Sequence, residues 1–179
     1  MSRKLIVTIH LYLAAFFSPI VIIMALSGGL YLLDYEGEVV RSEVGHVADA
    51  RLDADSQTLR SDVVAILATL DIDARVEEVR VRGTNFYTRP SSRQNYTLRQ
   101  TESGVDVEVA NPNLQAMMME LHKGHGPKIY VLLETVFAVG LMLIMLSGMY
   151  LGWMSPAYKQ KTILLSAAGL LVFAVAVLL

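Results

Sequence analysis

Three long runs of apolar residues dominate the pattern of hydrophobic and polar positions along this chain. Residues 5–33 contain no charged side chain. Residues 129–154 contain a single one, Glu134, and residues 162–179 contain none. A helix needs about 20 apolar residues to cross the hydrocarbon core of a bilayer, with a range of roughly 17–25. The pattern therefore predicts three transmembrane helices.

The segment between the first two runs has the mixed pattern of a small folded domain. Apolar residues recur at helical spacing from Leu59 to Leu70, which predicts an amphipathic helix. After Asp71 the period changes to two, as in antiparallel strands with one buried face. The predicted order is one helix, then three or four antiparallel strands, then a short helix from Leu114 to about Lys123.

Basic residues in short flanking segments indicate which side of the membrane each segment occupies. Arg3 and Lys4 precede the first helix, and no acid accompanies them. Lys159 and Lys161 lie between the second and third helices, again without an acid. This bias predicts a cytoplasmic N-terminus and places the segment between the first two helices on the other face, which is the periplasm if the membrane is the inner membrane of a Gram-negative bacterium. A cleaved signal peptide is the alternative for the first helix, but it would have a shorter apolar run, of about 7–15 residues.

These features predict an α-helical membrane protein with a small extracytoplasmic α+β domain inserted between the first and second helices. The inserted segment would be periplasmic. The predicted segments are transmembrane helices at 5–33, 129–154 and 162–179, the periplasmic domain at 34–128, and a cytoplasmic loop at 155–161.

Composition limits the chemistry that this chain can perform. Hydrophobic residues make up 54% of the chain, charged residues 18%, and the net charge is −2. Those values exclude an ordinary soluble enzyme and a nucleic-acid-binding protein. The chain has no cysteine, which excludes disulfides, iron–sulfur clusters, thiolate zinc sites and covalent attachment of c-type haem. Among the remaining polar positions, the four histidines are the most informative.

Three of the histidines lie at the beginnings of predicted transmembrane helices. His10 lies inside the first helix, where an ionisable residue is a functional hypothesis by default. His122 and His125 precede the second helix, whereas His46 is predicted to be a surface residue. Both helices end in a similar motif, Leu26-Ser27-Gly28-Gly29-Leu30-Tyr31-Leu32 in the first and Leu146-Ser147-Gly148-Met149-Tyr150-Leu151 in the second.

Because the two helices run in opposite directions, the motif at the end of each lies level with histidine at the beginning of the other. Small residues in membrane helices allow close packing, and they also leave room for a flat planar ligand. Both interpretations stay open. The predicted groups are His10 with Ser147, Gly148 and Gly152, and His122 and His125 with Ser27, Gly28 and Gly29.

This arrangement favours b-type haem as a cofactor. Haem iron takes imidazole as an axial ligand, and b-type haem needs no covalent attachment to cysteine. His122 and His125 are three residues apart on one helix face, so they cannot readily ligate one iron from opposite sides. If two histidines ligate one iron, the second must come from another chain, so we predict a homodimer or a larger membrane complex. The candidate cofactor-binding residues are His10, His122, His125, Ser147, Gly148 and Gly28, with the three histidines as axial ligands of haem iron.

Much of the chain resembles one protein family. The stretch from His10-Leu11-Tyr12-Leu13-Ala14 to Ser27-Gly28-Gly29-Leu30 resembles the opening helix of PepSY-associated transmembrane proteins. The stretch from Leu121-His122-Lys123-Gly124 to Ser147-Gly148-Met149-Tyr150-Leu151-Gly152-Trp153 is similar to their second helix, and the segment between is similar to a PepSY domain. The resemblance implies haem ligation by His10 and His122. It also implies electron transfer across the membrane to a ferric siderophore or another oxidised acceptor. His125 is a candidate from its position alone.

Two other functional classes remain as alternatives. The chain could be a membrane-anchored interaction module without a cofactor, or it could handle metal ions at the periplasmic face. The second alternative would use Met117, Met118 and Met119 with His122 and His125. A basic patch of Arg80, Arg82, Arg89 and Arg93 could attract an anionic siderophore or a lipid headgroup, although a solvated strand face is the favoured interpretation.

Overall fold

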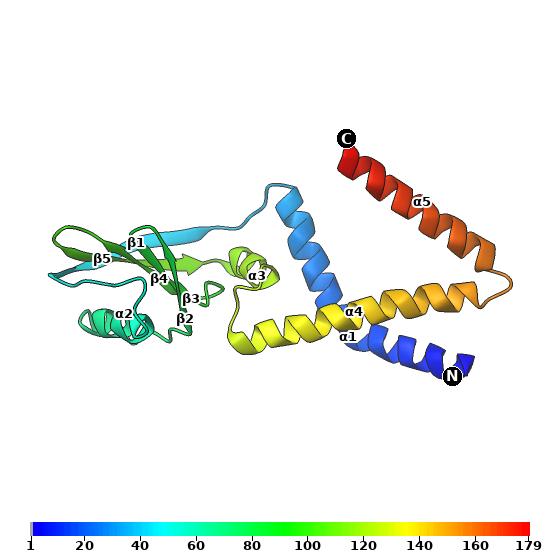
Figure 1. The fold of residues 1–179 in the computed structure, drawn as a ribbon, viewed down its shortest axis with the longest axis horizontal. Coiled ribbons are helices and arrows are strands. Elements are labelled where there is room, and N and C mark those ends of the chain that lie inside the picture. The colour runs from blue at the N-terminus through cyan, green and yellow to red at the C-terminus, as the bar shows by residue number, and fades with distance from the viewer. Residues whose placement is uncertain (1) are drawn as a thin grey trace. The chain divides into compact units, whose positions relative to one another are not determined.

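The structure, a computed structural model, describes residues 2–179. The chain forms two compact units. One contains the residues up to Val21 together with Thr135–Leu179, and the other contains Ile22–Glu134. Three long helices supply most of the first unit, while the second is built around a β-sheet (Figure 1).

The three apolar runs form three helices that are long and apolar enough to cross a membrane, which confirms the prediction. Such helices keep nearly all backbone hydrogen bonds within the segment, as a bilayer requires, and the exception in α1 is Pro19, which has no N–H. Pro127 directly precedes α4, where its missing N–H costs nothing. The helices are α1 (Arg3–Leu32), α4 (Lys128–Trp153) and α5 (Lys159–Leu178).

Within the first unit, α1 and α4 pack closely at one glycine. The ring of Phe17 lies against Gly140, so close that a Cβ atom at Gly140 would overlap the ring. Phe137 completes the contact, with its ring centroid 5.9 Å from that of Phe17. Both phenylalanines are buried, although most of the surrounding helix surface is exposed apolar side chain. Small-residue packing of this kind is how membrane helices associate.

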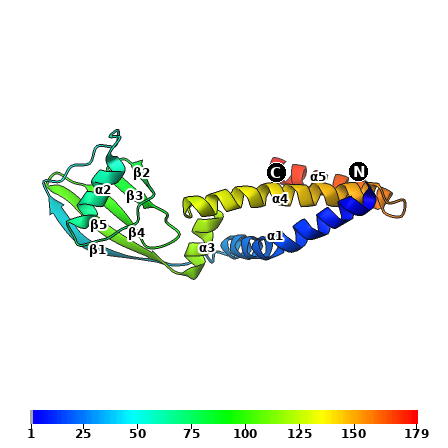
Figure 2. The ribbon, with the colours of Figure 1, turned by 90° about the horizontal axis from the view of Figure 1, so that it is seen from below.

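The second unit contains a five-stranded antiparallel sheet with the order β1-β5-β4-β3-β2. Helix α2 (Leu59–Ala68) covers one face of the sheet, as Figures 1 and 2 show. The strands are β1 (Val39–Ala48), β2 (Glu78–Arg82), β3 (Asn85–Arg89), β4 (Asn95–Gln100) and β5 (Gly104–Pro112).

The core of the second unit lies between α2 and the sheet. Val63 and Leu67 of α2 are fully buried, as the predicted helical spacing requires. Leu98, Val105 and Val107 meet them from β4 and β5. The amphipathic helix and the alternating strands were therefore predicted correctly. The opposite face of the sheet carries polar and charged side chains.

The predicted order of elements along the chain was wrong at its beginning, because the strand β1 precedes the helix α2. The sequence pattern hides β1 for two reasons. Nearly all of its residues are exposed, so it has no buried face to mark with a period of two. A β-bulge between Glu43 and Gly45 also shifts the register against β5 and breaks the alternation. His46, predicted to lie on an exposed stretch, is a surface residue of this strand.

Helix α3 (Leu114–His122) connects the sheet to α4. The side chain of Asn113 accepts a hydrogen bond from the backbone N–H of Ala116 and caps the helix. Gly124 follows the helix with a φ of +72°, the left-handed conformation that ends helices and favours glycine. The short helix and its termination by Gly124 agree with the sequence prediction.

Candidate functional site

A hydrogen bond joins His10 to Ser147 within the first unit. Nδ1 of His10 lies 2.9 Å from Oγ of Ser147, and the two residues come from α1 and α4. The Ser147 hydroxyl also donates to the carbonyl of Ile144, at 3.0 Å, within its own helix. A Cβ at the next residue, Gly148, would lie 3.4 Å from Cε1 of His10, in ordinary van der Waals contact. Gly148 therefore lies directly beside the imidazole ring.

The same arrangement recurs within the second unit. Nδ1 of His122 lies 3.0 Å from Oγ of Ser27, which is buried. The Ser27 hydroxyl donates to the carbonyl of Met24 at 3.0 Å. A Cβ at Gly28 would lie 3.3 Å from Cε1 of His122. Two Ser-Gly pairs, far apart in the sequence, thus hold two histidines in the same way.

The contacts of the serines favour one tautomer for each histidine. A serine has one hydroxyl proton, so it can make both of its contacts only when it donates to the carbonyl of its own helix and accepts from Nδ1 of the histidine. In that tautomer, Nδ1 of His10 and of His122 carries the proton. Nε2 then keeps its lone pair, which is the state required of a histidine that binds a metal.

The two other glycines predicted to lie level with these histidines have different surroundings. No atom outside its own helix backbone and neighbours lies within 4 Å of the Cβ position of Gly29. A Cβ at Gly152 would lie 2.5 Å from Oγ1 of Thr162, in α5. Gly152 therefore allows the close approach of α4 and α5.

His125 lies after the end of α3, so it does not share a helix face with His122 as predicted, and its hydrogen-bond partner differs from those of the other two candidate histidines. Its Nδ1 lies 2.9 Å from a carboxylate oxygen of Glu120. The Ser91 hydroxyl donates to the same oxygen, and Arg89 and Lys123 approach the carboxylate. The backbone carbonyl of His125 also accepts from the N–H of Ser91 at 3.1 Å. This network connects α3 to the loop after β3, and the sequence pattern contained no signal for it.

Charges and hydrogen bonds set the pKa of two carboxyl groups in this unit. Burial raises the pKa of Glu120, but hydrogen bonds from Ser91 and His125 outweigh it, so the pKa lies below the ordinary 4.5. Hydrogen bonds from His46 and Arg99 lower the pKa of Asp106 below 3.8. Both carboxylates are therefore stabilised in their charged form by the fold.

We expect the unfolding free energy of this unit to decrease in acid. A carboxyl whose pKa is lowered by folding stabilises the fold above its unfolded pKa, and this contribution is lost as pH falls through the folded value. For Glu120 the loss begins below about pH 4.5. Calorimetry of the purified chain between about pH 6 and pH 3 measures this decrease in the free energy of unfolding. Glu120→Gln should have a shallower decrease, and Glu102→Gln, at an exposed turn, should match the unmodified chain. Equal slopes in all three proteins would contradict this prediction.

The methionines predicted as alternative metal ligands differ in burial. Met119 is buried against the unit, whereas Met117 and Met118 are only partly buried. Within residues 2–179, no group of three or more His, Asp or Glu side chains could hold a metal ion.

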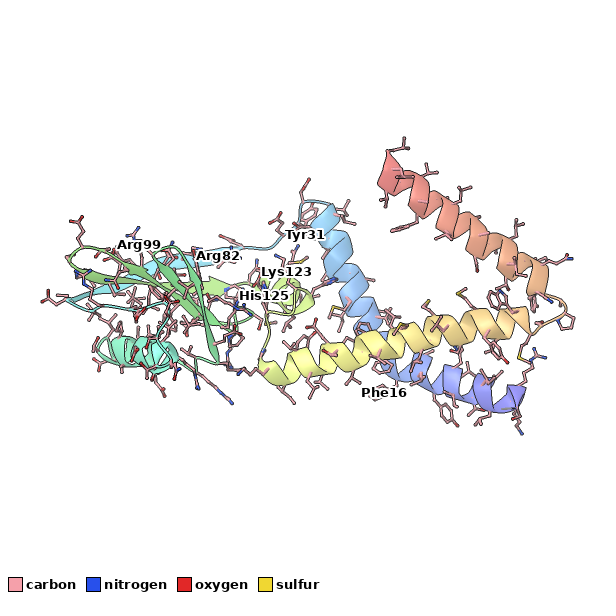
Figure 3. The ribbon with its side chains drawn as sticks, in the orientation of Figure 1. Phe16, Tyr31, Arg82, Arg99, Lys123 and His125 are labelled. Atoms are coloured by element: carbon pink, nitrogen blue, oxygen red, sulfur yellow. The ribbon has the colours of Figure 1, made fainter. Side chains whose placement is uncertain are left out.

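Lys123 lies over the ring of Tyr31, 5.8 Å from its centroid, and joins the end of α3 to the end of α1 (Figure 3).

Comparison with known proteins identifies one family. The family described as PepSY-associated TM region matches residues 7–175, a stretch that includes both histidine–serine pairs and the inserted sheet. No curated protein and no solved structure matched the chain. The match confirms the resemblance inferred from the helix motifs, and with the three apolar helices it identifies a membrane protein. This chain belongs to the PepSY-associated transmembrane family.

Proposed function

We propose that this chain is a b-type haem-binding protein of the bacterial inner membrane that passes electrons across the membrane. A ferric chelate or another oxidised compound would be the acceptor. The observation that carries this proposal is the repeated pair His10–Ser147 and His122–Ser27, each followed by a glycine beside the imidazole. The positively charged flanks favour a cytoplasmic N-terminus and a periplasmic sheet unit.

The donor chemistry of both pairs fits an axial ligand of haem. Each imidazole is held at Nδ1 by a serine oxygen and presents Nε2, the nitrogen that would bind iron. In α1, His10 lies near the beginning and Ser27 near the end, so one site would serve each side of the membrane. Haem iron, when bound, would supply one-electron redox chemistry. The apolar helices would exclude water and hold the imidazoles in one tautomer.

Each pair contributes a single histidine, so ligation by two imidazoles needs a second chain. A homodimer would bring two copies of each histidine and complete both sites by symmetry. The exposed apolar surfaces of α1, α4 and α5 are available for such contacts or for lipid.

The experiment that tests the proposal is a reduced-minus-oxidised absorption spectrum of the protein, expressed with a haem precursor and purified in mild detergent. Sharp bands typical of low-spin haem with two histidine ligands are expected. A flat spectrum from folded protein would exclude haem binding. The haem content per chain, with the mass of the complex, tests the dimer.

Removing the serine hydroxyls should weaken haem binding without removing the ligands. Ser147→Ala and Ser27→Ala each leave an imidazole that can rotate and change tautomer, so haem affinity should decrease by about tenfold or more. Thr8→Val is the matched control, because Thr8 also donates a hydroxyl hydrogen bond to a carbonyl of its own helix, that of Lys4, and its hydroxyl bonds no histidine. Equal haem retention in all three variants would show that the serines serve only helix packing.

A membrane-anchored interaction module is the second candidate, and the position of β1 favours it. This ten-residue strand pairs with β5 alone and forms one edge of the sheet. A free edge can accept a strand from a partner. A colourless, folded protein that co-purifies with a partner would favour this function over haem binding.

A further inference from the structure

The second unit contains a cavity on the face of the sheet opposite α2. Its volume is about 960 Å³, and β1 to β5, α3 and the start of α4 all contribute to its wall. Ligand pockets for small molecules typically measure about 300–1,000 Å³. The cavity is therefore large enough for an organic ligand and much larger than a single ion needs.

The charge of the cavity differs from that of the segment that forms it. Residues 34–128 contain 16 acidic and 11 basic side chains. Six basic residues line the cavity, against three acidic ones, Glu36, Glu78 and Glu120. The fold thus gathers positive charge on one surface of an acidic domain. The basic residues are Arg41, Arg80, Arg82, Arg89, Lys123 and Lys128.

Several of these basic groups keep donors available for a ligand. Arg82 is exposed and has no side-chain hydrogen bond or ion pair with any residue that the structure describes. Arg80 pairs with Glu78 at 2.6 Å and Arg41 with Glu108 at 3.0 Å, which leaves part of each guanidinium group unused. Figure 3 labels Arg82 at the strands and Lys123 at the end of α3.

An unpartnered hydroxyl lies in the wall of the cavity. Oγ1 of Thr97, in β4, is buried and has no hydrogen-bond partner within residues 2–179. Thr97 pairs with Tyr87 of β3 and Glu108 of β5, so its side chain projects from the face opposite α2. A buried hydroxyl without a partner costs free energy, and the acceptor oxygen of a ligand removes that cost once rotation about χ1 turns the hydroxyl into the cavity.

We propose that this cavity binds a phosphate-bearing anion. Guanidinium groups present paired N–H donors that match the oxygens of phosphate, and the Thr97 hydroxyl adds a neutral donor. Lys128 and Val131, in the first turn of α4, line one end of the cavity. The cavity therefore reaches the beginning of a membrane-spanning helix, and the phosphate can belong to a phospholipid headgroup or to a soluble phosphate ester. This inference does not depend on haem binding.

Calorimetric titration of the full chain, purified in a non-ionic detergent and freed of lipid, tests the site. The probes are glycerol phosphate and a short-chain phosphatidylglycerol, with short-chain phosphatidylcholine for comparison. Saturable binding of either anionic probe is expected. Binding of glycerol phosphate assigns the site to soluble esters, and binding of phosphatidylglycerol alone assigns it to headgroups. Absence of saturable binding by both anionic probes overturns the proposal.

Two variants locate the binding, and a third serves as a control. Arg82→Gln should weaken binding by about fivefold or more, because it removes a charged donor that has no other partner. Thr97→Val keeps the shape of the side chain, and it should weaken binding without lowering the melting temperature of the unliganded protein. Arg99→Gln makes the same change of charge at a residue that does not line the cavity and pairs with Asp106. Unchanged affinity in both Arg82→Gln and Thr97→Val, or an equal loss in Arg99→Gln, overturns the site.

Discussion

Replacing either His10 or His122 by alanine should remove the haem bound at that site, and the double variant should be colourless. Each histidine would supply the only imidazole that its chain contributes to its site, so its loss leaves no ligand in place. The two sites lie in different structural units. Each single variant should therefore keep the haem signal of the other site. Haem content per chain and the reduced-minus-oxidised spectrum measure both effects.

The two remaining histidines are matched controls for this prediction. His46 pairs with Asp106 on the surface, at 2.7 Å, and His46→Ala should keep the full haem content. His125 is held by Glu120, with no Ser-Gly pair beside it, and His125→Ala should also keep it. Normal haem content in both His10→Ala and His122→Ala would refute the proposed ligands. Loss of haem in His125→Ala would instead assign one of the iron ligands to His125.

Valine at Gly140 should break the packing of α1 against α4. The new side chain would overlap the ring of Phe17, which cannot move away freely because Phe137 and Phe16 pack around it. Overpacking a close contact typically costs about 1–3 kcal/mol, and a helix contact as narrow as this one should lie at the upper end. The chain has one tryptophan, Trp153 at the end of α4, and its fluorescence reports unfolding of this unit during titration with a denaturing detergent.

Two further variants separate this contact from a general effect of valine in a membrane helix. Gly169→Val, in α5, adds the same side chain where nothing lies within 4 Å, and it should leave the unfolding midpoint unchanged. Phe17→Ala combined with Gly140→Val removes the overlapping ring and should recover part of the lost stability. An unchanged midpoint in Gly140→Val would show that α1 and α4 do not depend on this contact.

The candidate site was only partly visible in the sequence. The opposite directions of the two helices predicted that Ser147 lies level with His10 and Ser27 near the level of His122. The contacts themselves depend on the rotation of each helix about its axis. That rotation brings Gly28 and Gly148 beside an imidazole ring, whereas it leaves the Cβ position of Gly29 open and places that of Gly152 against Thr162.

Local sequence patterns could not predict the cavity or the hydrogen-bond network around Glu120. Arg82, Thr97 and Lys123 come from three different elements, and only the pairing of the strands and the position of α3 bring them to one surface. The sequence showed a basic patch near β2 and β3, but it gave no sign of the buried hydroxyl or of Glu120 between Ser91 and His125.

Sequence alone is enough to predict the three membrane helices, the amphipathic helix α2 and the family, because each follows from local composition, from a short period or from a continuous motif. Tertiary structure decided the place of β1, whose exposed and bulged strand has no pattern of its own and is fixed by pairing with β5. It also decided that Nδ1 of His10 and of His122 faces a serine oxygen, a contact that favours the tautomer with the proton on Nδ1.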